Sequence, residues 1–260
     1  MTLKHLSFSS INQYITCGLQ FRFRKIDNLE PEYTSDALVF GSSIHKVLAK
    51  FNQHRTKGVL TPASELGDWF EIYWKGAVES NGLIQYAPSN NYESCLKQGR
   101  KLLEIFCQEY LDDTQYQVLE IEKDFSLNID NLLYPIIGYI DLVETDEFGN
   151  ILLTEYKTSG KSYSKNQIDL NDQVTLYHLA MQTIYPDREI ISKIDCLIKT
   201  KIPKFDQYYT FRDADDHRRL VNTIFQVAKG IEAEVFIPNT NSWKCSGCEY
   251  KTACNKWLKS

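Results

Sequence analysis

The chain has 260 residues, of which 43% are hydrophobic and 24% are charged, so it can bury a large core and we exclude an extended disordered protein. Its formal net charge is −5 at pH 7, and it contains seven cysteines. No apolar run is long enough to span a membrane and no N-terminal signal pattern is present. These features predict a cytoplasmic protein with no membrane partner, whose cysteines are free thiols or metal ligands rather than disulfides.

The negative charge is unevenly distributed along the chain. Residues 104–149 contain twelve acidic residues and one basic residue, so the segments on either side are net positive. Basic residues cluster at 157–165, 193–204 and 244–259. Such clusters are more often solvated faces, but they are also compatible with a DNA-binding surface.

The first part of the chain is predicted to be helical. A serine-rich stretch offers N-caps for a helix that continues to about Arg24 and contains Cys17. The spacing of apolar residues predicts further helices over residues 36–57, 62–79 and 92–111. The aromatic residues of this region either pack between the helices, which is the more usual case, or stack on unpaired bases.

The second part of the chain is predicted to contain a β-sheet. Alternating apolar and polar residues predict a strand over residues 117–129, and the apolar runs 136–143 and 151–153 flank a polar turn, as in a β-hairpin. The later elements are, in chain order, a helix that begins at Asn171 or Asp172, strands over 190–200 and 205–211, and a helix over 213–234. This order predicts an α/β fold with a central mixed β-sheet flanked by helices.

The predicted hairpin carries three ionisable side chains. Asp141 lies in its first strand, while Glu155 and Lys157 stand two residues apart in its second strand and therefore point to the same face. Each could be a solvated residue or part of a salt bridge, but polar groups in apolar strands are costly to bury without a partner or a metal. The carboxylates of Asp141 and Glu155 and the main-chain carbonyl of Tyr156 predict a Mg²⁺ or Mn²⁺ site, beside which Lys157 can orient a water.

A second group of candidate ligands lies near the C-terminus. Cys245, Cys248 and Cys254 have the spacing C-x2-C-x5-C, which is a strong indication of a metal site. No fourth ligand follows locally, and Cys17 is the natural candidate. Four cysteines suit zinc as well as an iron–sulfur cluster, so the spacing alone does not decide between them.

Three motifs together resemble those of a known nuclease family. They are Gly138-x-x-Asp141, Glu155-x-Lys157-Thr158-Ser159 and Gln173-x-x-x-Tyr177. With them, nearly the whole chain resembles the RecB-type branch of the PD-(D/E)XK superfamily. Within that branch the resemblance is to standalone iron–sulfur nucleases, such as those that trim DNA for CRISPR adaptation, and to the nuclease domain of AddB-type recombination enzymes.

The resemblance implies a restriction-endonuclease-like core and several residue roles. His45, in the element Gly41-x-x-x-His45, is implied to be a metal ligand. An imidazole among oxygen ligands would favour Mn²⁺ over Mg²⁺. Gln173 and Tyr177 are implied to face the metal site and to orient DNA. Cys17 and the C-terminal cysteines are implied to hold a [4Fe-4S] cluster.

We therefore expect a metal-dependent DNA nuclease that acts as an exonuclease on single-stranded ends in DNA repair, recombination or CRISPR adaptation. The chain is expected to form one nuclease domain, with a helical part (1–111), a nuclease core (112–234) and a Cys-rich tail (235–260) joined to Cys17. The phosphate-binding loop Gly-x-x-x-x-Gly-Lys-Ser/Thr is absent, so unwinding would need a helicase partner, and a CRISPR-adaptation protein is a second possible partner. The alternatives are a non-catalytic DNA- or protein-binding module with a structural metal site, and a zinc-binding interaction protein.

Overall fold

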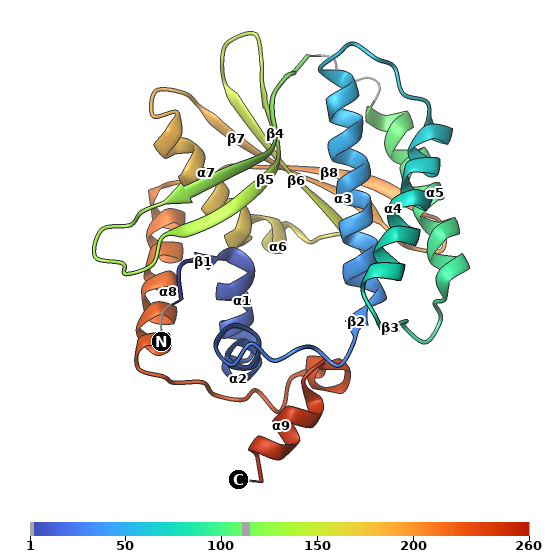
Figure 1. Ribbon diagram of the computed structural model, residues 1–260. Coiled ribbons are helices and arrows are strands. Elements are labelled where there is room, and N and C mark those ends of the chain that lie inside the picture. The colour runs from blue at the N-terminus through green and yellow to red at the C-terminus, as the bar shows by residue number, and fades with distance from the viewer. Residues whose placement is uncertain (1–2, 111–114, 260) are drawn as a thin grey trace. The chain divides into compact units, whose positions relative to one another are not determined.

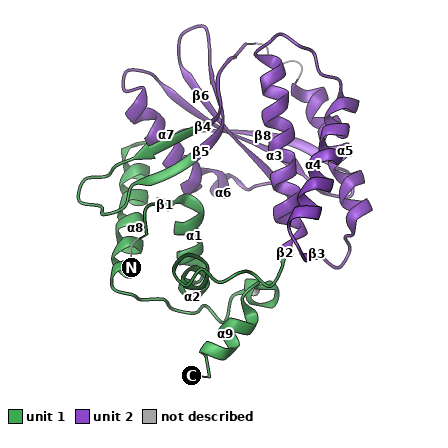
Figure 2. Ribbon diagram, viewed as in Figure 1, with its two compact units in different colours: residues 1–33, 124–138, 213–260 green, residues 34–123, 139–212 purple. Residues whose placement is uncertain are grey.

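One mixed β-sheet and the helices that pack on it make up most of the computed structural model, which describes residues 3–110 and 115–259 (Figure 1). The chain folds into two compact units (Figure 2). The core unit comprises residues 34–123 and 139–212, and the terminal unit comprises residues 1–33, 124–138 and 213–260. The single nuclease domain stays a prediction, and its expected internal boundary at residues 111 and 112 lies outside the described residues.

The sheet follows the order β5-β6-β7-β8. These strands are β5 (Ile136–Thr145), β6 (Ile151–Ser159), β7 (Ile190–Ile198) and β8 (Lys204–Thr210), and β4 (Gln117–Leu127) also pairs with β5. β6 is antiparallel to β5 and parallel to β7, and β7 is antiparallel to β8, so the sheet is mixed. In the terminal unit, β1 (Leu6–Ser7) pairs in parallel with the first residues of β5. The predicted α/β class with a central mixed sheet is confirmed.

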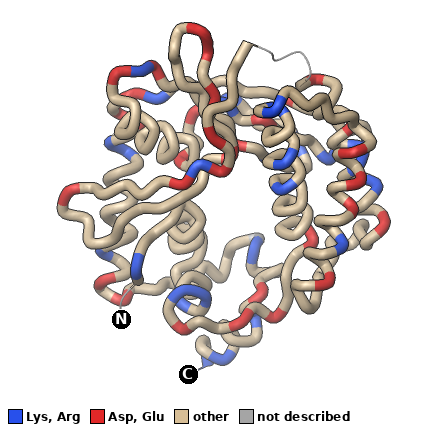
Figure 3. Tube along the Cα trace, turned by 45° about the horizontal axis from the view of Figure 1, so that its top comes forward, with Lys and Arg blue, Asp and Glu red and all other residues tan. Residues whose placement is uncertain are grey.

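Three helices form one layer of the core unit. They are α3 (Asp36–Arg55), α4 (Ala63–Ser80) and α5 (Tyr92–Tyr110), close to their predicted ranges, and the hydroxyl of Ser35 caps α3 by accepting a bond from the N–H of Leu38. A short parallel pair, β2 (Thr34–Ser35) and β3 (Ile84–Gln85), lies beside them. Acidic and basic residues are interspersed over α4 and α5, as on a solvated face (Figure 3).

The aromatic residues of these helices form the core of the layer. Trp69, Phe70 and Trp74 are buried, and the ring of Phe70 lies against Gly99, where any side chain on α5 would overlap it. Packing, rather than base stacking, is therefore the role of these three side chains. Tyr73 is partly buried and packs on the same cluster.

The opposite side of the sheet carries the helices that follow the hairpin. α6 (Lys165–Asp169) is a short helix that the sequence patterns did not predict, and α7 (Asp172–Ile184) packs on β6 and β7. The Asn171 side chain accepts hydrogen bonds from the N–H groups of Gln173 and Val174, which confirms it as the N-cap. This cap fixes the start of α7 and hence the position of Gln173.

The terminal unit contains the first and last helices of the chain. They are α1 (Phe8–Thr16), α2 (Gly18–Phe21), the π-helix η1 (Arg22–Ile26), α8 (Ala214–Glu232), the 3₁₀ helix η2 (Trp243–Gly247) and α9 (Lys251–Trp257). The prediction of one continuous helix to Arg24 is wrong, because Cys17 is extended (φ −162°) and ends α1. At Gly18 a Cβ would lie only 2.9 Å from the backbone nitrogen of Ile237, so the chain breaks where another segment passes close to it. None of the helices within the described ranges has the length and apolar character of a membrane span.

Buried polar contacts connect α3 to the strands of the core unit. Arg55 donates hydrogen bonds to Asn52 Oδ1 at 3.0 Å and to Glu144 Oε1, on β5, at 2.9 Å. Asn52 Nδ2 donates in turn to the hydroxyl of Tyr156, on β6, at 3.0 Å. Glu144, Asn52 and Tyr156 are almost fully buried. These contacts hold α3 in register with the two strands of the hairpin.

We expect Arg55→Met to destabilise the fold by about 3–5 kcal/mol, because it removes the ion pair from a buried carboxylate. The measurement is urea unfolding. Arg100→Met is the matched control, since Arg100 pairs with Asp68 and Glu71 at the surface, where an ion pair contributes about 0–1 kcal/mol. Equal losses in the two variants would contradict the role of the buried network.

Candidate active site

Asp141 stands where β5, β6 and α3 meet. Its side chain is 6% exposed, and its Oδ1 atom lies 2.8 Å from Nδ1 of His45 on α3. Its Oδ2 atom accepts a hydrogen bond from the backbone N–H of Tyr156 on β6 at 2.7 Å. The structure therefore brings His45, Asp141 and the main chain at Tyr156 together in the core unit. Because both carboxylate oxygens are engaged, the Asp141 side chain is well oriented.

A second network surrounds Lys157 on β6. Its ammonium group donates to Glu155 Oε1 and to Gln173 Oε1, both at 2.6 Å. Gln173 Nε2 donates to Glu155 Oε1 and to the hydroxyl of Tyr177, both at 2.8 Å. Glu155 and Lys157 thus share one face of β6. Gln173 of α7 contacts both of them, and Tyr177 of α7 contacts Gln173. Lysine has three N–H donors, and residues of the described ranges accept two of them here, which leaves one for a water or a substrate oxygen.

One acidic residue of this site, Glu122, belongs to none of the sequence motifs, and the sequence predicts only an outward or supporting position for it. The potential ligand atoms of His45, Glu122 and Asp141 all lie within 4.8 Å of one another, and together they could hold a metal ion. Glu122 belongs to β4 and has a left-handed backbone (φ 51°). In the sequence its only signal is an acidic residue in the strand before the hairpin, with nothing to indicate its direction.

The metal ligands predicted from the sequence overlap with this group only in part. Both sets contain His45 and Asp141, while Glu155 is engaged by Lys157 and Gln173. One imidazole and two carboxylates form a suitable donor set for a divalent cation of the Mn²⁺ type. The residues present therefore fit a divalent metal ion.

The ionisable groups of the site lie close together and shift one another's pKa values. Burial, together with the nearby carboxylate of Asp141, raises the pKa of Glu155 to about 7. Burial favours the neutral form of His45, but Asp141 outweighs this effect and raises the pKa of His45 to about 9. Burial also opposes the charge on Lys157, yet Glu155 raises its pKa, so Lys157 remains an ammonium ion. A divalent cation would supply the positive charge that protons supply here.

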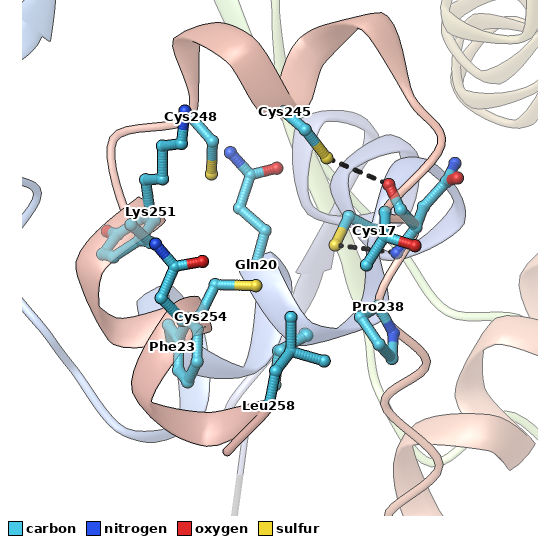
Figure 4. Close-up of a pocket in the computed structure, with 14 residues that line it drawn as sticks. Cys17, Gln20, Phe23, Pro238, Cys245, Cys248, Lys251, Cys254 and Leu258 are labelled. Carbon is cyan, nitrogen blue, oxygen red and sulfur yellow. Dashed lines mark hydrogen bonds between the residues drawn. The ribbon is translucent and has the colours of Figure 1, made fainter.

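A cavity in the terminal unit collects the four predicted cysteine ligands. It has a volume of about 220 Å³, and its wall includes Cys17, Cys245, Cys248 and Cys254. Figure 4 shows Cys17 and Cys245 on one side of it and Cys248 and Cys254 on the other. Residues separated by more than two hundred positions in the sequence therefore face one space.

The contacts of these thiols leave them available as ligands. Cys17 Sγ accepts a hydrogen bond from the N–H of Asn239 at 3.5 Å, and the Cys245 thiol donates to the carbonyl of Asn239 at 3.1 Å. The other three cysteines, Cys95, Cys107 and Cys196, are buried in the core unit. The cavity thus offers four soft sulfur donors, which fit a four-cysteine metal site.

The sequence matches the PD-(D/E)XK nuclease superfamily over residues 5–255, and the chain therefore belongs to this superfamily. The match covers the core unit, its candidate metal site and the cysteine cavity. The protein is thus assigned to a class of nucleases that use divalent metal ions. No curated protein matches the chain.

The chain is similar to two solved structures. A protein from Eubacterium rectale described as a candidate exonuclease is 11% identical, with a TM-score of 0.58, and the match covers 94% of this chain and 88% of that one. At this identity the likeness shows the fold alone. The crystal structure of SSO0001 is 13% identical over 97% of this chain and 86% of that one, with a TM-score of 0.46.

Proposed function

We propose that this protein is a metal-dependent DNA nuclease whose active site lies in the core unit. The observation that carries the proposal is the convergence of Asp141, Glu155 and Lys157 from two adjacent strands, with Lys157 Nζ 2.6 Å from Glu155 Oε1. His45, Asp141, Glu155 and the carbonyl of Tyr156 would hold the cation. When bound, a divalent ion polarises the scissile phosphate and lowers the pKa of a water.

The remaining residues of the site position the reactants. Lys157 is an ammonium ion with one free N–H, so it can orient the attacking water and stabilise the negative charge that develops on the phosphate. Gln173 bonds both Lys157 and Glu155 and so fixes the distance between them. The Tyr177 hydroxyl accepts a hydrogen bond from Gln173 and so helps to orient it. Both α7 residues would also contact the DNA strand.

The test of this proposal is DNA cleavage by the purified protein in Mn²⁺, in Mg²⁺ and in EDTA. We expect cleavage with either metal, none in EDTA, and a loss of at least about 10²-fold in Asp141→Asn with an unchanged melting temperature. Binding of DNA without cleavage in both metals would instead support the non-catalytic module.

We further propose that the enzyme is an exonuclease that prefers single-stranded ends. The aromatic residues that are buried between the helices are not available to stack on bases. A groove of about 370 Å³ between α3 and α4 instead supports the proposal. Its lining includes Lys46, which follows His45 on α3, and Tyr73, which is partly buried. An ammonium group and an aromatic ring suit the phosphate and base of an unpaired nucleotide.

Labelled linear and closed circular substrates test this preference. Linear single strands should be degraded faster than linear duplexes, and closed circles should resist. Equal cleavage of closed circular duplex and linear single strands would contradict the exonuclease proposal while leaving the nuclease assignment intact.

The cysteine cavity supports a proposal about the branch of the superfamily. Cys17, Cys245, Cys248 and Cys254 would hold a [4Fe-4S] cluster, with zinc as the alternative, that joins the two ends of the chain within the terminal unit. Together with the Gln173-x-x-x-Tyr177 motif, such a cluster would support a relationship to the RecB-type iron–sulfur nucleases and the AddB nuclease domain. Its role would then be in DNA repair, recombination or CRISPR adaptation, with a helicase or an adaptation protein as partner.

A further inference from the structure

Glu122 is the acidic residue of the site that none of the sequence motifs contains. It lies on β4, and its carboxylate falls within 4.8 Å of the ligand atoms of both His45 and Asp141. None of the side-chain hydrogen bonds or ion pairs within the described part of the chain involves the Glu122 carboxylate. Its neighbour Glu120, by contrast, pairs with Lys123 at 2.8 Å. Glu122 is an exposed residue, and its carboxylate thus lies close to that of Asp141 without a donor from the described residues.

The backbone explains how the side chain reaches this position. Glu122 has φ 51°, in the left-handed region that glycine adopts freely and that other residues adopt rarely. A left-handed residue within a strand turns the chain locally and redirects the side chain. The conformation therefore brings the Glu122 carboxylate to the group formed by His45 and Asp141.

The electrostatics of this arrangement favour a cation. Two carboxylates at this separation repel each other, and the single hydrogen bond in the group joins His45 to Asp141 at 2.8 Å. A divalent ion would attract both carboxylates and accept the imidazole nitrogen as a third donor. Glu155 could keep its hydrogen bonds to Lys157 and Gln173, because both use Oε1, and still offer its second oxygen to the ion.

We propose that Glu122 is a further ligand of the catalytic cation, beside His45, Asp141 and Glu155. The inference rests on the proposed function, because it adds a ligand to the same metal centre. It also assigns a role to β4, a strand outside the hairpin that carries the sequence motifs.

The experiment is a titration of the metal-free protein with Mn²⁺ in the absence of DNA. Binding is measured by calorimetry or from the electron paramagnetic resonance signal of the free ion. Glu122→Gln keeps the shape of the side chain but removes its charge, so it should weaken Mn²⁺ binding by at least about tenfold. Glu122→Gly should weaken binding as much while the protein folds normally, because glycine adopts the left-handed conformation without strain. Glu120→Gln, two residues away in the same strand, should bind Mn²⁺ like the unmodified protein.

Two further variants separate this inference from the proposed function. If His45→Ala and Asp141→Asn weaken Mn²⁺ binding and both Glu122 variants bind it normally, Glu122 is not a ligand and the metal centre stands. If Mn²⁺ binding is unchanged in all four variants, the metal centre itself is in the wrong place and the proposed function loses its basis. Weakened binding in the Glu122 variants, with Glu120→Gln unaffected, supports the assignment.

Discussion

Lys157→Met should lower the cleavage rate by about 10²–10⁴-fold while Mn²⁺ binding stays close to that of the unmodified protein. Lys157 lies next to the proposed ligand Glu155 and keeps one N–H for a water or a phosphate oxygen. Methionine retains the length and packing of the side chain but provides no donor and no charge. Single-turnover cleavage of a labelled strand measures the effect.

The control for a general loss of positive charge is Lys229→Met, at an exposed position of α8 in the terminal unit. It should cleave DNA at the rate of the unmodified protein. If Lys157→Met also cleaves at that rate, Lys157 does not position the water or stabilise the developing charge. If Lys157→Met instead loses Mn²⁺ binding, its main role is to hold Glu155 in place.

The part of this site that could be predicted is the part that depends on strand geometry. The side chains of a strand alternate between its two faces, so Glu155 and Lys157 had to share one face wherever the strand was placed. The apolar runs on either side of the polar turn required a hairpin, which brought Asp141 next to them. Asn171 could be identified as an N-cap because its side chain bonds locally, to residues two and three positions later.

The contribution of Glu122 could not be predicted because it depends on tertiary structure. Nothing in the sequence indicates that the backbone of this glutamate is left-handed. The residues that its side chain approaches, His45 and Asp141, lie on α3 and β5. The break at Cys17 has a similar origin, since it follows from the close approach of residues 236 and 237 to Gly18. Helix propensity alone predicts that the helix continues there.

Substitution of the cysteines that line the cavity should also have a large effect, on both metal content and stability. Protein purified without oxygen should contain about four irons per chain and absorb broadly at roughly 400 nm, whereas a zinc protein would be colourless. Cys17→Ser and Cys248→Ser should each lose the iron, although the two residues lie far apart in the sequence. Each variant should also lower the melting temperature by roughly 5 °C or more, which corresponds to at least about 2 kcal/mol for a chain of this size.

The size of that loss follows from how little else packs around the cavity. The buried cluster there contains only Leu19, Phe23 and Tyr250 among the described residues, and each such side chain contributes about 1.5–3 kcal/mol. A group bound by thiolates from both ends of the chain would add a comparable amount, because its binding energy is also folding energy. Cys107→Ser is the control, since its hydroxyl can still donate to the Thr61 carbonyl that the thiol of Cys107 contacts, and it should keep its iron. Retention of iron in Cys17→Ser, together with its loss in a variant of a core cysteine such as Cys107→Ser or Cys196→Ser, would show that Cys17 is not the fourth ligand.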